Sequence, residues 1–245
     1  MIGSPSYDGK LDVWYVNSLI QTLKLADQYN IEVIPIWVSF DALIQRCRND
    51  TLAMALQQDC DDLIWIDTDI EWEPEWFYRL LSHPVDIVGG TYPKKGDLEQ
   101  YVVNIGNNVE GRLDANGLME VGGLGTGFLR FNRRACQWLW DNSPPYIEVD
   151  KGGIEKRWAF DVAIQNNDLI SEDIWVCKRL IHEGGFKIYL DPTMTCGHVG
   201  GKKYIGNFWN WFNTKFKPAN APAGISYLEK YKGRFNGNNP AATNY

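Results

Sequence analysis

Hydrophobic positions in the first half of the chain follow two different spacings. Residues 12–29 and 43–56 carry apolar side chains three and four positions apart, which is typical of helices that cover a core. Residues 31–37 and 63–66 are short apolar runs of the kind seen in strands buried on both faces. Residues 74–82 begin with a proline suited to a first helical turn. This alternation predicts βαβ units around a mostly parallel sheet with helices on both faces.

The pattern changes in the second half, where apolar runs are shorter and glycine and asparagine are frequent. Short strands around turn-forming residues are typical of an antiparallel hairpin. We therefore expect a small antiparallel extension of the sheet. The further elements are expected as a strand at 86–88, a hairpin of 101–105 and 118–121, helices at 134–140 and 174–183, and a strand at 186–190.

The two ends of the chain differ from the rest. The first three residues are too few for a full strand, so either the first strand is short or residues that precede it are absent from this numbering. The last residues are rich in Asn, Gly, Pro and Ala, a composition typical of a poorly ordered or loosely packed arm. We expect one domain over residues 1–217 and a tail over residues 218–245.

Composition limits the classes of protein to which the chain can belong. The net charge of −7 argues against a nonspecific binder of phosphate backbones, which needs clustered Lys and Arg, but allows a nucleic-acid substrate held by a local patch. The five cysteines are odd in number and form no Cys-x-x-Cys, so we expect reduced thiols rather than disulfides or a zinc site. No charged segment followed by an apolar one opens the given sequence, so we expect no secretion leader, and no apolar run reaches about 18 residues. We expect a cytoplasmic protein without a membrane span.

The most informative residues follow the apolar run at 63–66. Asp67, Thr68 and Asp69 come directly after it, so two carboxylates lie one residue apart where a strand ends. In open α/β sheets, ligands bind just beyond the carboxyl ends of the strands. This position suits a divalent cation that shares its oxygen ligands with substrate phosphates. The alternative is that these acids only precede the helix at 74–82, whose first turn favours negative charge.

Other short motifs occur in order along residues 3–204. They are the loop Pro5-Ser6-Tyr7-Asp8, the helix start at 46–49, Asp67-Thr68-Asp69, the loop at 89–95, Gly125-Thr126-Gly127, Glu172-Asp173 and His198. In this order they resemble the nucleotide-sugar-dependent glycosyltransferases of the GT-A fold, especially compact viral, phage and bacterial members. The resemblance implies a single Rossmann-like domain, in which residues 1–95 bind the nucleotide sugar and residues 96–217 carry the acceptor and catalytic groups. For a viral protein it implies the host cytoplasm.

The resemblance also implies a metal site. Asp69, with Asp67, would contact Mn²⁺ or Mg²⁺ and the ribose of the donor, and Thr68 between them would lie against the donor. His198 resembles a third protein ligand, and neutral imidazole is a common ligand for such metals. The alternative for His198 is a loop histidine whose hydrogen bonds are satisfied by the backbone.

The donor site implied by the resemblance begins at the first loop. Pro5, Ser6, Tyr7 and Asp8 would hold the base of the donor, with Tyr7 as a stacking face and Asp8 as a hydrogen-bond acceptor. The alternative is a simple turn, because Pro, Ser, Asp and Gly form turns in any case.

Further donor contacts are implied on three later segments. Arg46, Arg48 and Asn49 resemble the donor-facing helix, and one of the two arginines is expected to be only a solvated helix charge. Lys94 and Lys95, like the later pair Lys202 and Lys203, would offset the charge of the pyrophosphate or be solvated. Gly127 belongs to the Gly-Thr-Gly turn expected beside the donor.

The implied reaction is transfer of a sugar from a nucleoside diphosphate sugar, with a UDP-sugar favoured, to a hydroxyl. An inverting mechanism needs a carboxylate that takes the hydroxyl proton, and a metal with cations that stabilise the leaving pyrophosphate. Asp173 is the expected base and Glu172 the second candidate. The alternative is that these acids only cap the helix at 174–183. Retention of configuration, the acceptor (a glycan, a protein or a modified DNA base) and the oligomeric state stay open.

Two other functions fit parts of the sequence. A metal-dependent nucleotidyltransferase would also use strand-end carboxylates, but it would need a basic residue in the loop after the first strand, and Gly3 to Tyr7 contains none. A noncatalytic carbohydrate-binding protein would account for the 11 Trp, 12 Tyr and 10 Phe, but not for the acidic residues. The glycines at 122–127 do not match the spacing of a dinucleotide-binding loop.

Overall fold

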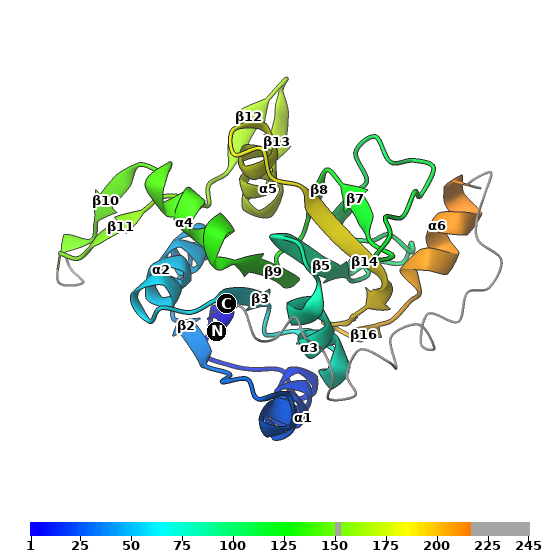
Figure 1. Ribbon diagram of the computed structural model, residues 1–245, viewed down its shortest axis with the longest axis horizontal. Helices are drawn as coiled ribbons and strands as arrows, with labels where there is room; N and C mark the ends of the chain where they lie inside the picture. Colours follow the sequence, from blue (N-terminus) through cyan, green and yellow to red (C-terminus); the bar gives the residue numbers. More distant parts are fainter. Residues whose placement is uncertain (150–152, 217–245) are drawn as a thin grey trace.

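The computed structural model describes residues 1–149 and 153–216, so the tail expected at 218–245 lies outside the described residues. The described chain forms a mixed α/β fold around a seven-stranded sheet with the order β2-β1-β3-β9-β5-β14-β7 (Figure 1). The strands of this sheet are β1 (Ile2–Ser6), β2 (Pro35–Ser39), β3 (Asp62–Ile66), β5 (Ile87–Thr91), β7 (Met119–Val121), β9 (Phe128–Asn132) and β14 (Ile188–Thr195).

The sheet is mixed: five of its seven strands run in one direction, in keeping with the expected mostly parallel sheet, and β9 and β7 run antiparallel to them. Strands β2, β1 and β3 are parallel to one another, as are β5 and β14. Strand β9 lies between β3 and β5 and runs antiparallel to both, and β7 runs antiparallel to β14 at the edge. The apolar run that forms β9 is indistinguishable by composition from a parallel central strand, because both are buried on two faces.

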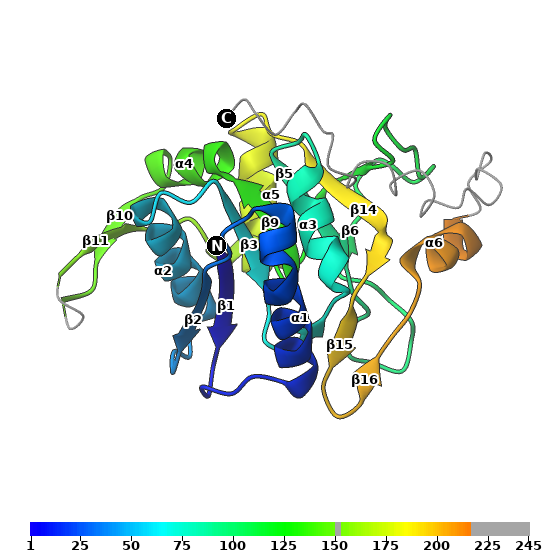
Figure 2. The same cartoon turned by 60° about the horizontal axis from the view of Figure 1, so that its bottom comes forward.

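Helices cover both faces of the sheet, as the alternating pattern predicts. Helices α1 and α3 pack around one cluster of buried side chains, and α2, α4, α5 and α6 around another on the opposite face (Figures 1 and 2). Within the described chain no helix is both long and apolar enough to cross a membrane. The helices are α1 (Val13–Tyr29), α2 (Ile44–Gln57), α3 (Pro74–Ser82), α4 (Arg133–Asp141), α5 (Glu172–His182) and α6 (Phe208–Phe216).

In the described chain, the remaining short strands form small sheets separate from the central one. One three-stranded sheet has the order β16-β15-β4, and three two-stranded pairs are β6–β8, β10–β11 and β12–β13. These strands are β4 (Ile70–Glu71), β6 (Val103–Asn104), β8 (Gly123–Leu124), β10 (Pro145–Ile147), β11 (Glu155–Arg157), β12 (Ala163–Gln165), β13 (Asp168–Ile170), β15 (Gly197–Val199) and β16 (Lys203–Tyr204). The expected hairpin of 101–105 with 118–121 is wrong, because β6 pairs with β8 and β7 pairs with β14.

The first strand is longer than expected. Strand β1 pairs with β2 along its whole length, so Pro5 and Ser6 belong to a buried strand rather than to a loop. This strand is hard to predict from the sequence because it contains two serines. Their hydroxyl groups form hydrogen bonds inside the protein, so both residues are buried. Ser4 Oγ lies 2.7 Å from Tyr15 Oη, and Ser6 Oγ donates to the Lys10 carbonyl at 2.9 Å. Pro5 lies beyond the last residue that pairs with β3, where a missing amide hydrogen is tolerated.

Two other boundaries shift for steric reasons. Strand β2 begins at Pro35, not at residue 31, because Asn30 ends α1 in the left-handed conformation and the chain reaches the sheet only after a connection. Strand β5 continues through Gly89 and Gly90, which we expected to begin a loop. A Cβ at Gly89 would lie 2.6 Å from the Phe128 carbonyl oxygen, so glycine here permits close packing against β9.

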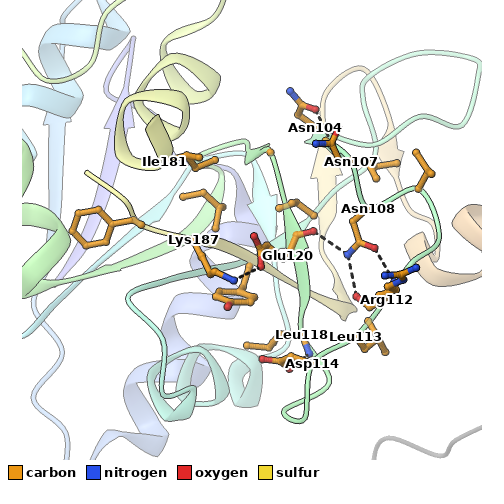
Figure 3. A pocket seen from close by; sticks show the side chains of 18 of the residues that line it. Asn104, Asn107, Asn108, Arg112, Leu113, Asp114, Leu118, Glu120, Ile181 and Lys187 are labelled. Carbon is orange, nitrogen blue, oxygen red and sulfur yellow. Dashed lines mark hydrogen bonds and ion pairs between the residues drawn. The ribbon is translucent and has the colours of Figure 1, made fainter. Parts of the chain in front are cut away.

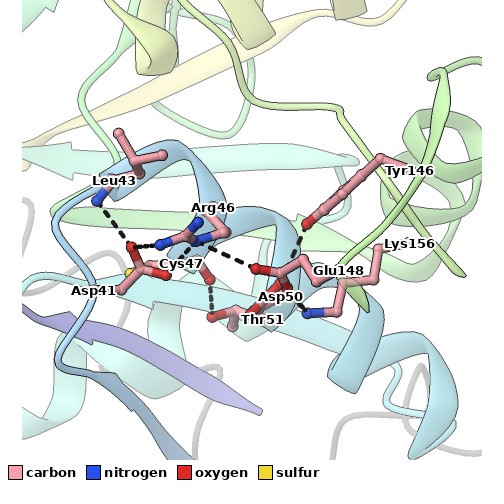
Figure 4. A network of polar contacts seen from close by, with 9 residues as sticks. All are labelled: Asp41, Leu43, Arg46, Cys47, Asp50, Thr51, Tyr146, Glu148 and Lys156. Carbon is pink, nitrogen blue, oxygen red and sulfur yellow. Dashed lines mark hydrogen bonds and ion pairs between the residues drawn. The ribbon is translucent and has the colours of Figure 1, made fainter. Parts of the chain in front are cut away.

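A network of charged side chains attaches the β10–β11 hairpin to α2 (Figure 4). Lys156 Nζ lies 2.6 Å from Asp50 Oδ1 and 2.5 Å from Glu148 Oε2, and Tyr146 Oη donates to Asp50 Oδ1 at 3.2 Å. Burial disfavours the ammonium, but the hydrogen bonds to both carboxylates outweigh this effect and raise the pKa of Lys156. The hairpin is therefore held by ionic contacts that are largely shielded from water.

We predict that Lys156→Met lowers the free energy of unfolding by about 2–4 kcal/mol, because two largely buried carboxylates lose this ammonium. Urea denaturation at pH 7 measures the change. The matched control is Lys10→Met, which removes the exposed ion pair of Lys10 with Asp8 and should leave stability unchanged. Equal effects of the two substitutions would contradict the role assigned to this network.

Candidate functional site

A buried arginine joins two carboxylates at the carboxyl ends of the strands. Arg48 Nη2 donates to Asp67 Oδ1 at 3.1 Å, and Arg48 Nε donates to Glu172 Oε1 at 3.3 Å. These three residues, here called the arginine–carboxylate cluster, come from α2, the end of β3 and the start of α5. Arg48 is only 3% exposed. Burial disfavours its charge, but Asp67, Glu172 and Asp173 outweigh burial and hold the pKa of the guanidinium above its ordinary value.

One nitrogen of the Arg48 guanidinium makes no hydrogen bond to any described residue. Within the described chain, Arg48 Nη1 is buried and has no hydrogen-bond partner. Buried donors without partners are rare in folded proteins and call for an explanation. An anionic ligand group at the cluster would supply the missing acceptor for the guanidinium.

Asp69 lies in a second group, beside His198 and Lys95. The pairing of β15 with β4 sets His198 opposite Ile70, and the Val199 amide donates to the Asp69 carbonyl at 2.8 Å. His198 Nε2 is then 3.6 Å from Asp69 Oδ2, and Lys95 Nζ contacts the same oxygen at 2.5 Å. Burial raises the pKa of Asp69, but the contact with Lys95 and the nearby His198 outweigh it and lower that pKa.

The tautomer of His198 is set by the backbone. Its Nδ1 lies 2.8 Å from the Pro93 carbonyl oxygen, which can only accept, so Nδ1 carries the hydrogen. The lone pair of a neutral ring is therefore on Nε2, the nitrogen that faces Asp69. This is the arrangement by which proteins orient a metal-ligating histidine.

The three expected metal ligands do not meet at one point. The carboxylate of Asp67 faces Arg48, whereas that of Asp69 faces His198 and Lys95. Among the residues that the structure describes, no group of three or more His, Cys, Asp or Glu side chains is placed to hold a metal ion. Asp69 and His198 form a two-ligand arrangement, and Thr68 between the acids offers its carbonyl to the Asp12 amide at the start of α1.

Gly127 connects Tyr92 to Asp67 through its backbone. Its amide donates to Tyr92 Oη at 3.0 Å, and its carbonyl accepts from the Asp67 amide at 3.3 Å. A Cβ here would lie 2.6 Å from the Tyr92 ring. The buried Tyr92 ring also meets the His198 ring edge-on at 5.0 Å between centroids. Gly127 thus permits the close approach of Tyr92, which links the cluster to Asp69 and His198.

The expected loop for the donor base is divided between strand and turn. Pro5 and Ser6 are buried in β1, as described above, and do not present a binding surface. Tyr7 follows the strand and is 75% exposed, and Asp8 pairs with Lys10 at 2.6 Å. Phe40, 82% exposed after β2, adds a second open aromatic ring at neighbouring strand ends.

Arg46 and Asn49 lie on α2, as expected, but their side chains contact other parts of the chain and not the arginine–carboxylate cluster. Arg46 Nε donates to Asp41 at 2.5 Å and lies 3.4 Å from Glu148, so it belongs to the network that holds the β10–β11 hairpin (Figure 4). Asn49 is fully buried and accepts from the amides of Ala159 and Phe160 at 2.9 and 2.8 Å. These two side chains hold the surrounding chain in place.

Sequence reasoning missed Tyr92 and left open whether Arg48 and Lys95 belong to the site. Arg48, Lys95 and Tyr92 contact the expected acids or histidine, whereas Lys94 is exposed and its amide donates to the Gln100 carbonyl at 2.7 Å. A signal for Arg48 exists, because it shares a helix face with the buried residues four and seven positions later, Leu52 and Ala55.

The start of α5 presents the two expected catalytic acids. Ser171 makes no side-chain capping bond to the helix; its hydroxyl donates to Asp173 instead. Asp173 Oδ1 also accepts from the Ile174 amide at 2.7 Å. Glu172 contacts Arg48, as described above. Asp173 is close enough to influence Arg48 and Tyr92 electrostatically. Both acids therefore border the same site.

Comparisons with known proteins concern the fold. No family model and no curated protein matches the sequence. Among solved structures, the chain is similar to the crystal structure of A197 from STIV, with a TM-score of 0.53 and 16% sequence identity. The match covers 84% of this chain and 93% of that chain. At this identity the likeness supports a Rossmann-like α/β fold.

We predict that Gly127→Ala lowers the free energy of unfolding by about 1–3 kcal/mol, because the added methyl group overlaps the buried Tyr92 ring. Urea denaturation measures the loss, and near-ultraviolet circular dichroism reports the displaced ring. Gly96→Ala is the control, since a Cβ there meets no atom within 4 Å. A Gly127→Ala protein as stable as the control would show that the contact with Tyr92 is unimportant.

Proposed function

We propose that this protein is a metal-dependent glycosyltransferase of the GT-A type, which transfers a sugar from a nucleoside diphosphate sugar to a hydroxyl acceptor. The observation that carries the proposal is the meeting of Arg48, Asp67 and Glu172 beside the Asp69–His198 pair. These residues lie at the carboxyl ends of the sheet strands, where ligands of α/β proteins bind. The group combines a buried cation, several carboxylates and an oriented imidazole.

The Asp69–His198 pair fits a divalent cation. Neighbouring ligands of an octahedral Mg²⁺ or Mn²⁺ ion lie about 3 Å apart, close to the 3.6 Å between Asp69 Oδ2 and His198 Nε2. Two protein ligands are enough when diphosphate oxygens and water complete the sphere. When bound, the ion would stabilise negative charge on the departing diphosphate.

The cations of this chain have defined tasks in the proposal. Arg48 holds Asp67 and Glu172 in place and keeps Nη1 available for a diphosphate oxygen. Lys95 contacts the Asp69 oxygen that the metal would use, so binding of the ion would release the ammonium toward the diphosphate. Tyr7 and Phe40 offer open aromatic faces for the donor base, and a UDP-sugar is the favoured donor.

Asp173 is the proposed general base of an inverting transfer. Glu172 is the weaker candidate because its carboxylate already accepts a hydrogen bond from Arg48 Nε and is held against the guanidinium. Asp173 has no direct ion pair with Arg48 and begins the same helix. It would take the proton of the acceptor hydroxyl as the new glycosidic bond forms and the diphosphate leaves.

A screen of donors tests the proposed function. The protein is incubated with UDP-, GDP- and CDP-sugars, with Mn²⁺ or with a chelator, and release of the nucleoside diphosphate is followed. We expect slow hydrolysis of one donor, which the chelator abolishes and which Asp69→Ala lowers by about 100-fold or more, since charge stabilisation is lost. Asp27→Ala, an exposed acid on α1, is the matched control and should keep full activity. If no donor is hydrolysed and none stabilises the protein with Mn²⁺ in a thermal shift, the proposal fails.

A second prediction separates the base from the donor site. Asp173→Asn should lower turnover by about 10²–10⁴-fold, the usual contribution of a general base, while the dissociation constant of the donor changes little. Turnover and donor titration are measured on the same samples. Glu172→Gln should instead weaken donor binding, because it disturbs Arg48. Loss of donor binding in Asp173→Asn would remove Asp173 from the role of base.

A further inference from the structure

A cavity of about 810 Å³ opens at the β7 edge of the central sheet (Figure 3). Its walls are the loop that includes Asn104 to Asp114, strand β7, the start of β14 and the end of α5. It is separate from the arginine–carboxylate cluster. Helix α5 contributes Glu172 to the cluster at one end and His182 to the cavity at the other, and ten residues of helix span about 15 Å.

The loop that forms one wall is fixed by many internal bonds. The Asn108 side chain donates to the carbonyls of Arg112 and Glu120 at 3.0 and 3.1 Å and accepts from the Arg112 amide at 2.9 Å (Figure 3). Gly111 has a φ of 64°, and a Cβ there would lie 2.5 Å from the Phe212 ring of α6. The cavity is therefore preformed, which lowers the ordering cost of binding.

The carboxylates, lysines and arginine that line the cavity are paired with one another or with nearby polar groups. Lys187 Nζ lies 2.8 Å from Glu120 Oε2, and Arg112 Nη2 lies 2.5 Å from Glu110 Oε2. Asp114 accepts from the amides of Asn116 and Leu118 at 2.8 and 2.9 Å. Lys178 donates to Gln165. A lining with acids and bases in balance offers little attraction for a nucleotide or another strongly charged ligand.

The remaining surface combines amides with apolar side chains. Asn104 and Asn107 are exposed at the cavity, and planar amides both donate and accept hydrogen bonds. Val109, 51% exposed, together with Ile181 and Tyr189, adds apolar surface. Hydroxyl groups of a sugar ring suit the first kind of surface, and its C–H faces suit the second.

We propose that this cavity binds a neutral oligosaccharide. The proposal goes beyond the transfer reaction and does not depend on it, because no residue of the cavity belongs to the arginine–carboxylate cluster or to the Asp69–His198 pair. A second sugar site on a glycosyltransferase would hold a long acceptor at a distance from the reacting hydroxyl. On a protein without that activity it would be a carbohydrate-binding site in its own right.

Isothermal titration of the full chain tests the proposal, without donor and without metal. The probes are the neutral hexasaccharides of cellulose, chitin, xylan and amylose. We expect at least one to bind with a dissociation constant of about 1 mM or lower. Val109→Trp, which places a large side chain in the opening, should weaken that binding by about tenfold or more. Asn107→Ala should weaken it by a smaller factor, since one amide is lost.

Ala115→Trp is the matched control, an exposed position of the same loop that does not line the cavity, and it should change affinity by less than about twofold. Asp69→Ala should bind the hexasaccharide as the wild type does, which separates this site from the proposed transferase site. The proposal is overturned if no hexasaccharide binds, or if Val109→Trp binds as tightly as Ala115→Trp.

Discussion

The burial of Arg48 between Asp67 and Glu172 is the constraint on which the rest of the site depends. A guanidinium stays charged at any pH a protein meets, so it can be buried only where carboxylates come with it. That requirement fixes three elements together: α2, which carries the arginine, the end of β3, and the start of α5. The acids of α5 border the strand ends because this ion-pair group holds them there. The unpaired Nη1 is a donor for which the fold itself supplies no acceptor.

Tyr92 extends the constraint to the second half of the site. It follows β5 directly. Its hydroxyl accepts a hydrogen bond from the Gly127 amide, and its ring contacts the His198 ring edge-on. The antiparallel insertion of β9 between β3 and β5 makes this possible, because it brings the Gly-Thr-Gly turn under both strand ends. The pairing of β15 with β4 then adds His198 beside Asp69. The Asp69–His198 pair and the arginine–carboxylate cluster therefore depend on the mixed central sheet and on the small β16-β15-β4 sheet.

The two ends of helix α5 border two regions of different chemical character. Its first turn lies among unbalanced charges around a buried cation, which suits a charged substrate and a reaction that develops charge. Its last turn borders a cavity in which charges are mutually neutralised and amides face apolar groups. Such a division is compatible with one large ligand that touches both regions or with two separate ligands. It also fits the position of the cavity at the β7 edge, which does not coincide with the candidate catalytic residues.

The sequence alone determined the features that depend on neighbours along the chain. Apolar spacing located the helices, with α3 at the expected residues, and placed Asp67 and Asp69 directly after β3, because periodicity is a local property. Tertiary structure decided the rest. Which arginine is buried depends on Glu172, 124 residues away, and the length of β1 depends on hydroxyl partners and on β2. The orientation of His198 depends on a carbonyl 105 residues earlier. These contacts join segments that are distant in the sequence. The spacing of apolar and polar residues along the chain reflects local structure only, so it does not predict them.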